Sequence, residues 1–330
     1  MLPVQSVAMD MSDPIVIAHR GASGLRPEHT IAAYTLAIEQ GADFIEPDLV
    51  PTRDGVLVAR HENEISETTD VAAHPEFAAR KATKTIDGKA VTGWFTEDFT
   101  LAELKTLRAK ERLPLLRGTR YDGQFDIPAL AEIIALAKAH GVGIYPETKH
   151  PSYFASIGLG TDVPLLAALR SAGWDRADAP VFIQSFEVAN LRALHAKTGV
   201  RLIQLMDASG APADGASPSY AAMATPAGLR AIAAYAYGIG PSKAMIRDGD
   251  IPATSLVADA HAAGLKVHPW TFRAENVFLP ASLRTGIDPR AHGRLRDEIA
   301  RYLELGVDGF FTDFPLDGVA ARDARRLPRR

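Results

Sequence analysis

Short apolar runs alternate with helical patterns along most of the chain, and this alternation constrains the fold more than any other feature. It predicts a parallel sheet flanked by helices. The strand candidates are residues 15–19, 43–49, 142–148, 181–185, 201–206, 236–240, 266–271 and 308–313. The helical stretches between them include residues 28–40, 128–140, 163–172, 187–198, 226–235, 253–263 and 292–305.

Glycine follows many of these helical stretches, just before the next strand: Gly41, Gly141, Gly199, Gly264 and Gly306. Glycine readily adopts the left-handed backbone conformation that helix ends often need, so each one predicts a helix C-terminus. Eight strand–helix units describe a (β/α)₈ TIM barrel, which we expect to be a single α/β domain over residues 15–323.

One interval, residues 62–125, does not follow the alternation of strand and helix patterns. It is far too long for an ordinary strand-to-helix loop in a barrel. Because loops after strands open onto the catalytic face, we expect a small inserted subdomain, a lid, on that face. Leucines spaced three apart predict a helix over residues 100–109 within it. The interval holds none of the candidate site residues, so we expect it to govern substrate choice rather than chemistry.

Composition excludes several classes of site and partner. Of 330 residues, 47% are hydrophobic and 23% are charged, as in soluble globular enzymes. A net charge of −4 gives no electrostatic case for nucleic acid, and no basic run suggests a membrane surface. We expect the Arg-rich C-terminus, residues 322–330, to be a solvated end. The absence of cysteine excludes disulfides, thiolate metal sites and a cysteine nucleophile. We therefore expect a small-molecule substrate as the partner, while the sequence indicates no oligomeric state.

No apolar run approaches about 18 residues, so we expect no membrane span. The first 14 residues contain no Lys or Arg and no apolar core, which argues against a signal peptide. We expect a cytoplasmic protein; a periplasmic or secreted one follows instead if the N-terminus has been trimmed.

Two acids, Glu46 and Asp48, lie in the apolar run FIEPDLV. Residues two apart in a strand leave the same face, roughly 7 Å apart at about 3.3 Å rise per residue. If both carboxylates were buried without a counter-charge they would repel each other. A divalent cation supplies that charge, and carboxylate oxygens suit Ca²⁺ or Mg²⁺. The alternative, a pair of solvated acids, is less favoured because His19 and His61 end neighbouring strand segments.

Glu147 and Lys149 repeat this spacing, which adds a carboxylate and a cation to an inward face. Pro47 and Pro146 lie beside these acids inside candidate strands, where the missing N–H would interrupt the hydrogen-bond ladder. We expect both prolines to mark the carboxyl ends of their strands.

His19 and His61 are the candidates for proton transfer. General acid–base catalysis needs one group to take a proton and another to give one. Histidine, with an unperturbed pKa of about 6.5, suits both roles. A lone histidine is more often a satisfied core residue, but a pair beside an acidic cluster favours catalysis. The sequence does not assign the acid and the base.

An ordered set of motifs runs along the chain: HRGA at 19–22, PEHT at 27–30, GADFIEPDL at 41–49, TRDG at 52–55, His61, YPETKHP at 145–151, IQSFE at 183–187, VHPWT at 267–271 and DGFFTDFP at 308–315. In this order they resemble the glycerophosphodiester phosphodiesterase family, and in particular its longer bacterial type with an insertion after the second strand. The resemblance covers nearly the whole chain and implies the same TIM barrel.

The resemblance also implies roles for individual residues. Glu46, Asp48 and Glu147 would be the ligands of one divalent cation, Ca²⁺ or Mg²⁺, and His19 and His61 would be the acid and the base. Substrate contacts are expected from Arg20 and Lys149, at the non-bridging phosphate oxygens, and from Gln184 and Trp270, in the substrate wall. Surface salt bridges are the alternative for Arg20 and Lys149, and packing accounts for Trp270 equally well.

Four further residues lie within these motifs or next to them. Glu28 either pairs with Arg20 or His19, or favours the start of its helix. Asp313 either supports the site or caps the next helix. Glu62 and His29 replace the Asp and Asn that are commoner in the resembled family, and we expect neither to touch the assigned metal or proton-transfer residues.

These observations predict a metal-dependent hydrolase that converts glycerophosphodiesters, such as glycerophosphocholine and glycerophosphoethanolamine, to sn-glycerol 3-phosphate and an alcohol. A lysophospholipase D-like activity on lipid phosphodiesters is the enzymatic alternative, and it requires an apolar route for an acyl chain. The alternative from another class is a barrel that has lost catalysis and serves for binding. Both histidines and all three carboxylates are present, which argues against that alternative.

Overall fold

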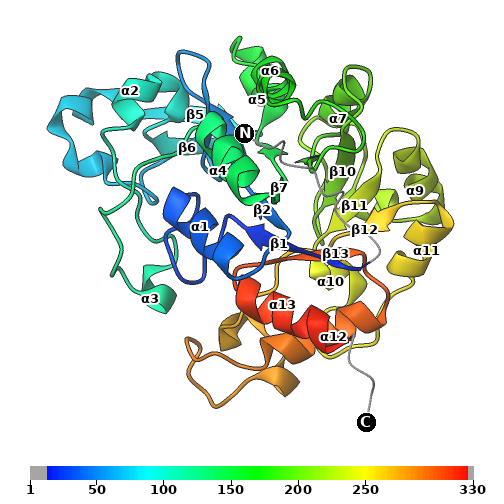
Figure 1. Cartoon of the computed structure of the whole chain (residues 1–330). Coiled ribbons are helices and arrows are strands. Elements are labelled where there is room, and N and C mark those ends of the chain that lie inside the picture. The colour runs from blue at the N-terminus through cyan, green and yellow to red at the C-terminus, as the bar shows by residue number, and fades with distance from the viewer. Residues whose placement is uncertain (1–12, 326–330) are drawn as a thin grey trace, which may run out of the picture.

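Parallel strands with helices on the outside form the body of the molecule (Figure 1). The structure is a computed structural model, and it describes residues 13–325. The barrel strands are β1 (Ile15–His19), β2 (Phe44–Glu46) continued by β3 (Asp48–Pro51), β7 (Gly143–Ile144) continued by β8 (Glu147–Thr148), β9 (Phe182–Ser185), β10 (Arg201–Met206), β11 (Gly238–Pro241), β12 (Lys266–Val267) and β13 (Gly309–Thr312). The expectation about an export signal in the first 14 residues falls almost wholly on residues 1–12, which lie outside the described residues.

These strands close into a ring. One ladder runs β13–β1–β2–β7 and the other runs β12–β11–β10–β9–β8–β3, so β2/β3 and β7/β8 belong to both. The remaining gap, between β12 and β13, is bridged by backbone hydrogen bonds from Asp308 N–H to the Val267 carbonyl (2.9 Å) and from Phe311 N–H to the Pro269 carbonyl (3.0 Å). The predicted (β/α)₈ barrel is confirmed.

Pro47 and Pro146 interrupt their strands but do not end them, so the expectation that they mark the carboxyl ends is wrong. Pairing resumes at Asp48 and at Glu147, directly after each proline. The proline carbonyls remain in the ladder, because Pro47 accepts from Glu147 N–H (2.9 Å) and Pro146 accepts from Gln184 N–H (2.9 Å). Each strand therefore lacks one N–H donor at the proline but continues in the same direction beyond it.

The outer helices are α1 (Ile31–Glu39), α4 (Leu130–His140), α5 (Pro151–Ser156), α6 (Asp162–Ala172), α7 (Val188–His195), α8 (Tyr220–Met223), α9 (Pro226–Ala233), α10 (Lys243–Ile246), α11 (Leu256–Ala262), α12 (Leu295–Glu304) and α13 (Pro315–Ala324). Gly141 ends α4 with φ +69°, as predicted. Aliphatic side chains fill the space between helices and strands. Inside the barrel, Tyr145 packs against Phe44, Phe182 and Phe311, so the interior is a filled core rather than a pore.

The segment between the second and third barrel strands has its own small architecture, in cyan in Figure 1. It contains β4 (Leu57–Ala59), antiparallel to β3, then the 3₁₀ turns η1 (Val71–Ala73), η2 (Pro75–Arg80) and η3 (Thr96–Asp98), the hairpin β5 (Ala82–Ile86)–β6 (Lys89–Gly93), α2 (Leu101–Leu104) and α3 (Pro114–Arg117). A separate hydrophobic cluster that includes Phe77, Trp94, Phe99 and Leu107 holds it together. The helix predicted over residues 100–109 is the single short turn α2.

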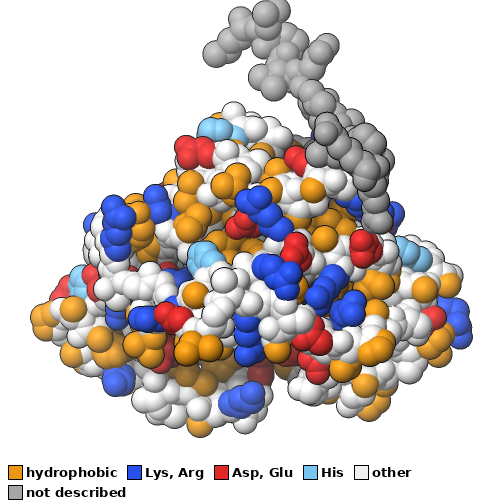
Figure 2. Space-filling model, turned by 90° about the horizontal axis from the view of Figure 1, so that it is seen from below, with side chains coloured by type: hydrophobic (Ala, Val, Ile, Leu, Met, Phe, Trp, Pro, Cys, Tyr) orange, Lys and Arg blue, Asp and Glu red, His pale blue; other side chains and the backbone are white. Residues whose placement is uncertain are grey.

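Basic, acidic and apolar side chains are interspersed over the face of the molecule seen in Figure 2. This mixture agrees with the small net charge of the chain. Within residues 13–325, no helix combines the length and the hydropathy that crossing a membrane requires.

Candidate active site

Strand register places the predicted site residues side by side. His19 pairs with Glu46 across β1 and β2. Asp48 pairs with Glu147 across β3 and β8, and Glu147 in turn pairs with Gln184 across β8 and β9. All of them lie toward the carboxyl ends of barrel strands, which is where TIM-barrel enzymes carry their active sites.

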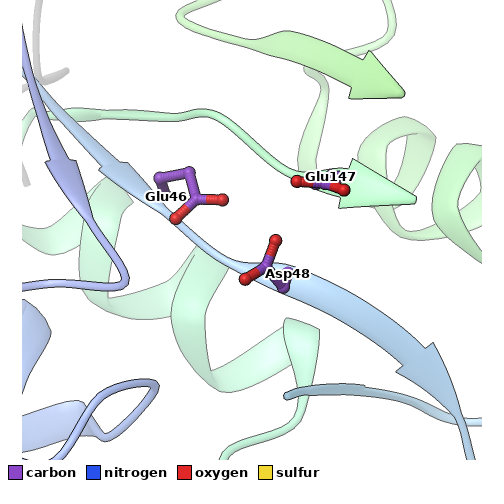
Figure 3. Close-up of side chains that lie close together, drawn as sticks. All are labelled: Glu46, Asp48 and Glu147. Atoms are coloured by element: carbon purple, nitrogen blue, oxygen red, sulfur yellow. The ribbon is translucent and has the colours of Figure 1, made fainter. Parts of the chain in front are cut away.

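Three carboxylates converge at this end of the barrel (Figure 3). Glu46 and Asp48 come from one interrupted strand, and Glu147 comes from its neighbour. One oxygen from each of the three lies within 4.8 Å of the others, and the residues are only 1%, 1% and 7% exposed. The structure therefore brings the three predicted metal ligands into one buried triad whose hard oxygen donors suit a divalent cation.

The triad is electrostatically strained. Burial and the Asp48 charge raise the pKa of Glu46 well above its usual range. Burial and Asp48 also raise the pKa of Glu147 to about 8, although the Lys149 ammonium lies 2.8 Å from its Oε1. Asp48 is equally buried, but Lys149 and Arg20 hold its pKa well below the usual range. Joint ionisation of all three at neutral pH therefore needs more positive charge, which a bound divalent cation provides.

Arg20 and Lys149 are buried against the triad rather than in surface salt bridges. Arg20 Nε lies 3.1 Å from Asp48 Oδ2, and Lys149 Nζ lies 3.9 Å from Asp48 Oδ1. Glu28 accepts from Arg20 Nη1 (2.9 Å), which confirms the first alternative for Glu28. The cap of α1 is Thr30, whose hydroxyl accepts from a backbone N–H of the first turn. The predicted contact of both cations with phosphate stays a prediction.

His19 is oriented by Asp313. Its Nδ1 lies 2.7 Å from Asp313 Oδ1. Burial and the nearby Arg20 guanidinium lower the pKa of His19 to about 4, while Arg273 and Arg117 overcome burial to keep the pKa of Asp313 well below its usual range. A neutral imidazole beside an ionised carboxylate must carry its proton on Nδ1, so Nε2 keeps its lone pair. Asp313 thus supports the site and makes no side-chain cap on α13.

His61 is oriented in the same way by Glu62, which accepts from its Nδ1. Desolvation, with the charges of Arg20 and Lys149, lowers the pKa of His61 to about 3. Hydrogen bonds from His61 and the guanidinium of Arg112 outweigh partial burial and keep the pKa of Glu62 below its usual value. The second imidazole is therefore also neutral at pH 7, with Nε2 available.

Gln184 and Trp270 differ in their relation to the triad. Gln184 donates from Nε2 to Glu46 Oε1 (3.1 Å) and is almost fully buried. Trp270 donates from Nε1 to the Gly240 carbonyl (2.9 Å) and meets Phe186 edge to face, with ring centroids 5.9 Å apart. Gln184 is thus hydrogen-bonded to the carboxylate cluster, whereas Trp270 packs against Phe186 and is partly exposed.

Comparison with known proteins assigns the family. The profile of the glycerophosphoryl diester phosphodiesterase family matches residues 19–317. A glycerophosphodiester phosphodiesterase of Arabidopsis thaliana is 39% identical over 93% of this chain and 85% of its own length. One from Haemophilus influenzae is 30% identical over 93% of this chain and 89% of its own. The chain belongs to the glycerophosphoryl diester phosphodiesterase family.

Solved structures agree on the fold. A putative glycerophosphoryl diester phosphodiesterase from Silicibacter pomeroyi superposes with a TM-score of 0.67 at 22% identity, covering 99% of both chains. A phosphodiesterase from Oleispira antarctica, solved with the product sn-glycerol-3-phosphate, gives a TM-score of 0.63 at 23% identity, covering 94% of this chain and 97% of its own. At such identities these likenesses establish the barrel fold alone.

The expectation that His29 and Glu62 touch neither the assigned metal ligands nor the proton-transfer residues is wrong for this family member. Glu62 holds His61, as described above. His29 is completely buried, with Nε2 lying 2.9 Å from Asp48 Oδ2 and Nδ1 lying 2.8 Å from the Tyr34 hydroxyl. Burial lowers the pKa of His29, so it is neutral and donates from Nε2 to Asp48. His29 therefore fixes the orientation of a triad carboxylate.

Replacing His29 with alanine should weaken binding of Ca²⁺ or Mg²⁺ by about 10- to 100-fold, because a ligating carboxylate loses the hydrogen bond that orients it. Isothermal titration calorimetry on the full chain measures the Kd. The exposed His195→Ala is a matched control that should bind as the wild type does. An unchanged Kd in a folded His29→Ala protein would show that Asp48 needs no such support.

Proposed function

We propose that this chain hydrolyses glycerophosphodiesters, such as glycerophosphocholine and glycerophosphoethanolamine, to sn-glycerol 3-phosphate and an alcohol. The observation that carries the proposal is a pair of histidines, each held through Nδ1 by a carboxylate, beside a buried carboxylate triad. Family membership supports it, as do the relatives named glycerophosphodiester phosphodiesterase and the Oleispira enzyme with its sn-glycerol-3-phosphate product.

The two histidines perform the proton transfers. A neutral imidazole with a free Nε2 lone pair takes the proton of the attacking nucleophile. The other imidazole must be protonated to give a proton to the departing alcohol oxygen, and the negative charge of the bound phosphodiester favours that protonation. Asp313 and Glu62 stabilise imidazolium at His19 and His61 respectively, so the surroundings allow either residue to serve as the acid.

Glu46, Asp48 and Glu147 would hold one divalent cation, and their oxygen donors suit both Ca²⁺ and Mg²⁺. When bound, such a cation supplies positive charge that offsets the charge of the phosphate and polarises its oxygens. Arg20 and Lys149 would bind the non-bridging oxygens, the arginine through its planar fork and the lysine as a point charge. Gln184 would hold Glu46 in place through its amide.

Within a single barrel domain over residues 15–323, we propose that residues 62–125 form a lid over the catalytic face. The polar contacts that this segment makes at the site support the proposal. Arg112 donates to Glu28 and Glu62, and Arg117 donates to Asp313. Such a charged cover favours a small polar substrate over one with an acyl chain.

A substrate panel tests the proposed function. The purified full chain should release sn-glycerol 3-phosphate from glycerophosphocholine, measured with a coupled dehydrogenase. EDTA should abolish the release, and Ca²⁺ or Mg²⁺ should restore it. Lysophosphatidylcholine should be a poor substrate. Turnover of lysophosphatidylcholine but not of glycerophosphocholine would favour lysophospholipase D-like activity, and turnover that ignores EDTA would contradict the metal requirement.

A further inference from the structure

We infer that Arg112 and Arg117, both in the inserted segment, are positioning residues that fix the carboxylates behind His61 and His19. The inference rests on the proposed function, because it assigns the two histidines to proton transfer. Arg112 precedes α3 and Arg117 is the last residue of that helix, and each arginine reaches a different histidine through a carboxylate. The insertion would then complete both halves of the catalytic pair in addition to covering the site.

The first half is a chain of contacts from Arg117 to His19. Arg117 Nη2 donates to Asp313 Oδ2 (2.6 Å), and Asp313 Oδ1 accepts from His19 Nδ1 (2.7 Å). Arg117 is itself anchored by Glu275 Oε1 (2.6 Å) and by the Ser23 carbonyl (2.9 Å). The side chains of Asp313 and Glu275 are 2% and 1% exposed, so little water is available to replace the guanidinium.

The second half runs from Arg112 to His61. The guanidinium binds both oxygens of Glu62, with Nη1 3.1 Å from Oε1 and Nη2 2.6 Å from Oε2. Glu62 Oε1 also accepts from His61 Nδ1. Arg112 Nε donates to Glu28 Oε1 (2.8 Å), and the other oxygen of Glu28 holds Arg20. A bidentate fork fixes the plane of a carboxylate, which a single hydrogen bond does not do.

This arrangement has a definite chemical use. A carboxylate on Nδ1 holds a neutral histidine in the tautomer that leaves Nε2 free, and it stabilises the imidazolium formed during proton transfer. If the carboxylate turns away, the imidazole can put its proton on Nε2 and cease to act as a base. Asp313 retains a second guanidinium, Arg273 Nε at 2.9 Å, so loss of Arg117 should disturb its histidine less than loss of Arg112 disturbs His61.

The kinetic test uses Arg112→Gln and Arg112→Lys in the full chain, assayed on glycerophosphocholine. The glutamine variant should lower kcat by about 10- to 100-fold, the range found when a hydrogen-bond partner that orients a metal ligand is lost. KM should change less than kcat, because Glu28 keeps its own hydrogen bond to Arg20 when Arg112 is lost. The lysine variant should fall between glutamine and wild type. The exposed Arg120→Gln removes the same charge from the same segment and should behave as wild type. A rise in KM at constant kcat would overturn the inference.

A spectroscopic test needs no substrate. In protein labelled with ¹⁵N-histidine, ring couplings should report the Nδ1–H tautomer at both His19 and His61 in the wild type. Arg112→Gln should shift His61 toward the Nε2–H tautomer and leave His19 unchanged, and Arg117→Lys should produce a smaller shift at His19. His61→Gln and His19→Gln assign the signals. Unchanged tautomers in folded variants would overturn the inference. If instead the wild type turns over no glycerophosphodiester, the proposed function fails while the tautomer shifts still test the positioning.

Discussion

Replacing either His19 or His61 with alanine should lower kcat on glycerophosphocholine by at least ~100-fold, the usual contribution of one positioned acid or base. Each imidazole presents its free Nε2 beside the triad because a carboxylate occupies its Nδ1. Removing the base leaves the nucleophile's proton without an acceptor, and removing the acid leaves the departing alkoxide unprotonated. Steady-state kinetics with saturating Ca²⁺ or Mg²⁺ measures the loss.

The double alanine variant should lose less than the product of the two single losses, because two groups that act in one reaction are not independent. The exposed His140→Ala provides a matched control with unchanged kcat. Melting temperatures of the variants separate a catalytic loss from a folding defect. Near-normal turnover in either folded single variant would remove that histidine from the proton-transfer pair.

Without metal, Glu147→Gln should be at least as stable as the wild type, and its advantage should grow with pH. Folding raises the pKa of Glu147 from 4.5 to about 8. A carboxyl whose pKa is raised in the folded state contributes stability that is fully present below its unfolded pKa and is lost as pH rises through the folded value. The wild type in EDTA should therefore lose melting temperature, relative to the variant, between pH 4.5 and about pH 8. Thermal melts of both proteins across this range measure the difference.

The same substitution should abolish the stabilisation by metal and most of the activity. A ligand that binds only the folded state adds about 2.7 kcal/mol at a hundredfold excess over Kd, so Ca²⁺ or Mg²⁺ should raise the wild-type melting temperature by several degrees. Glu147→Gln removes one of three carboxylate ligands at nearly constant shape and should show little rise. The exposed Glu67→Gln should keep the full wild-type response. A wild type whose melting temperature ignores both cations, or an active Glu147→Gln, would show that the triad is no metal site.

The sequence predicted those features that depend on local spacing. The strands at residues 15–19 and 201–206 have the predicted bounds, because each consists mainly of apolar side chains that the barrel buries. Glu46 and Asp48 were paired correctly since residues two apart in an extended chain share a face, a relation that survived the interruption at Pro47.

Contacts between distant segments could not be found in this way. Arg112 lies 50 residues from Glu62, and Arg117 lies 196 residues from Asp313, so no periodicity relates them. His29 was misjudged for a similar reason. It has a positive φ of +55° at the end of the loop that precedes α1, and that backbone conformation aims its side chain back at Asp48. Only the folded loop reveals this direction.

The strands that align Glu46, Asp48, Glu147 and Gln184 are synthesised early, whereas other parts of the site are synthesised late. These four residues all come from the first half of the barrel, β2 through β9, so the carboxylate cluster is complete once those strands have paired. His19 is different, because its carboxylate partner follows β13, the last strand to leave the ribosome. During synthesis, every residue of the carboxylate cluster is therefore made before the carboxylate that orients His19.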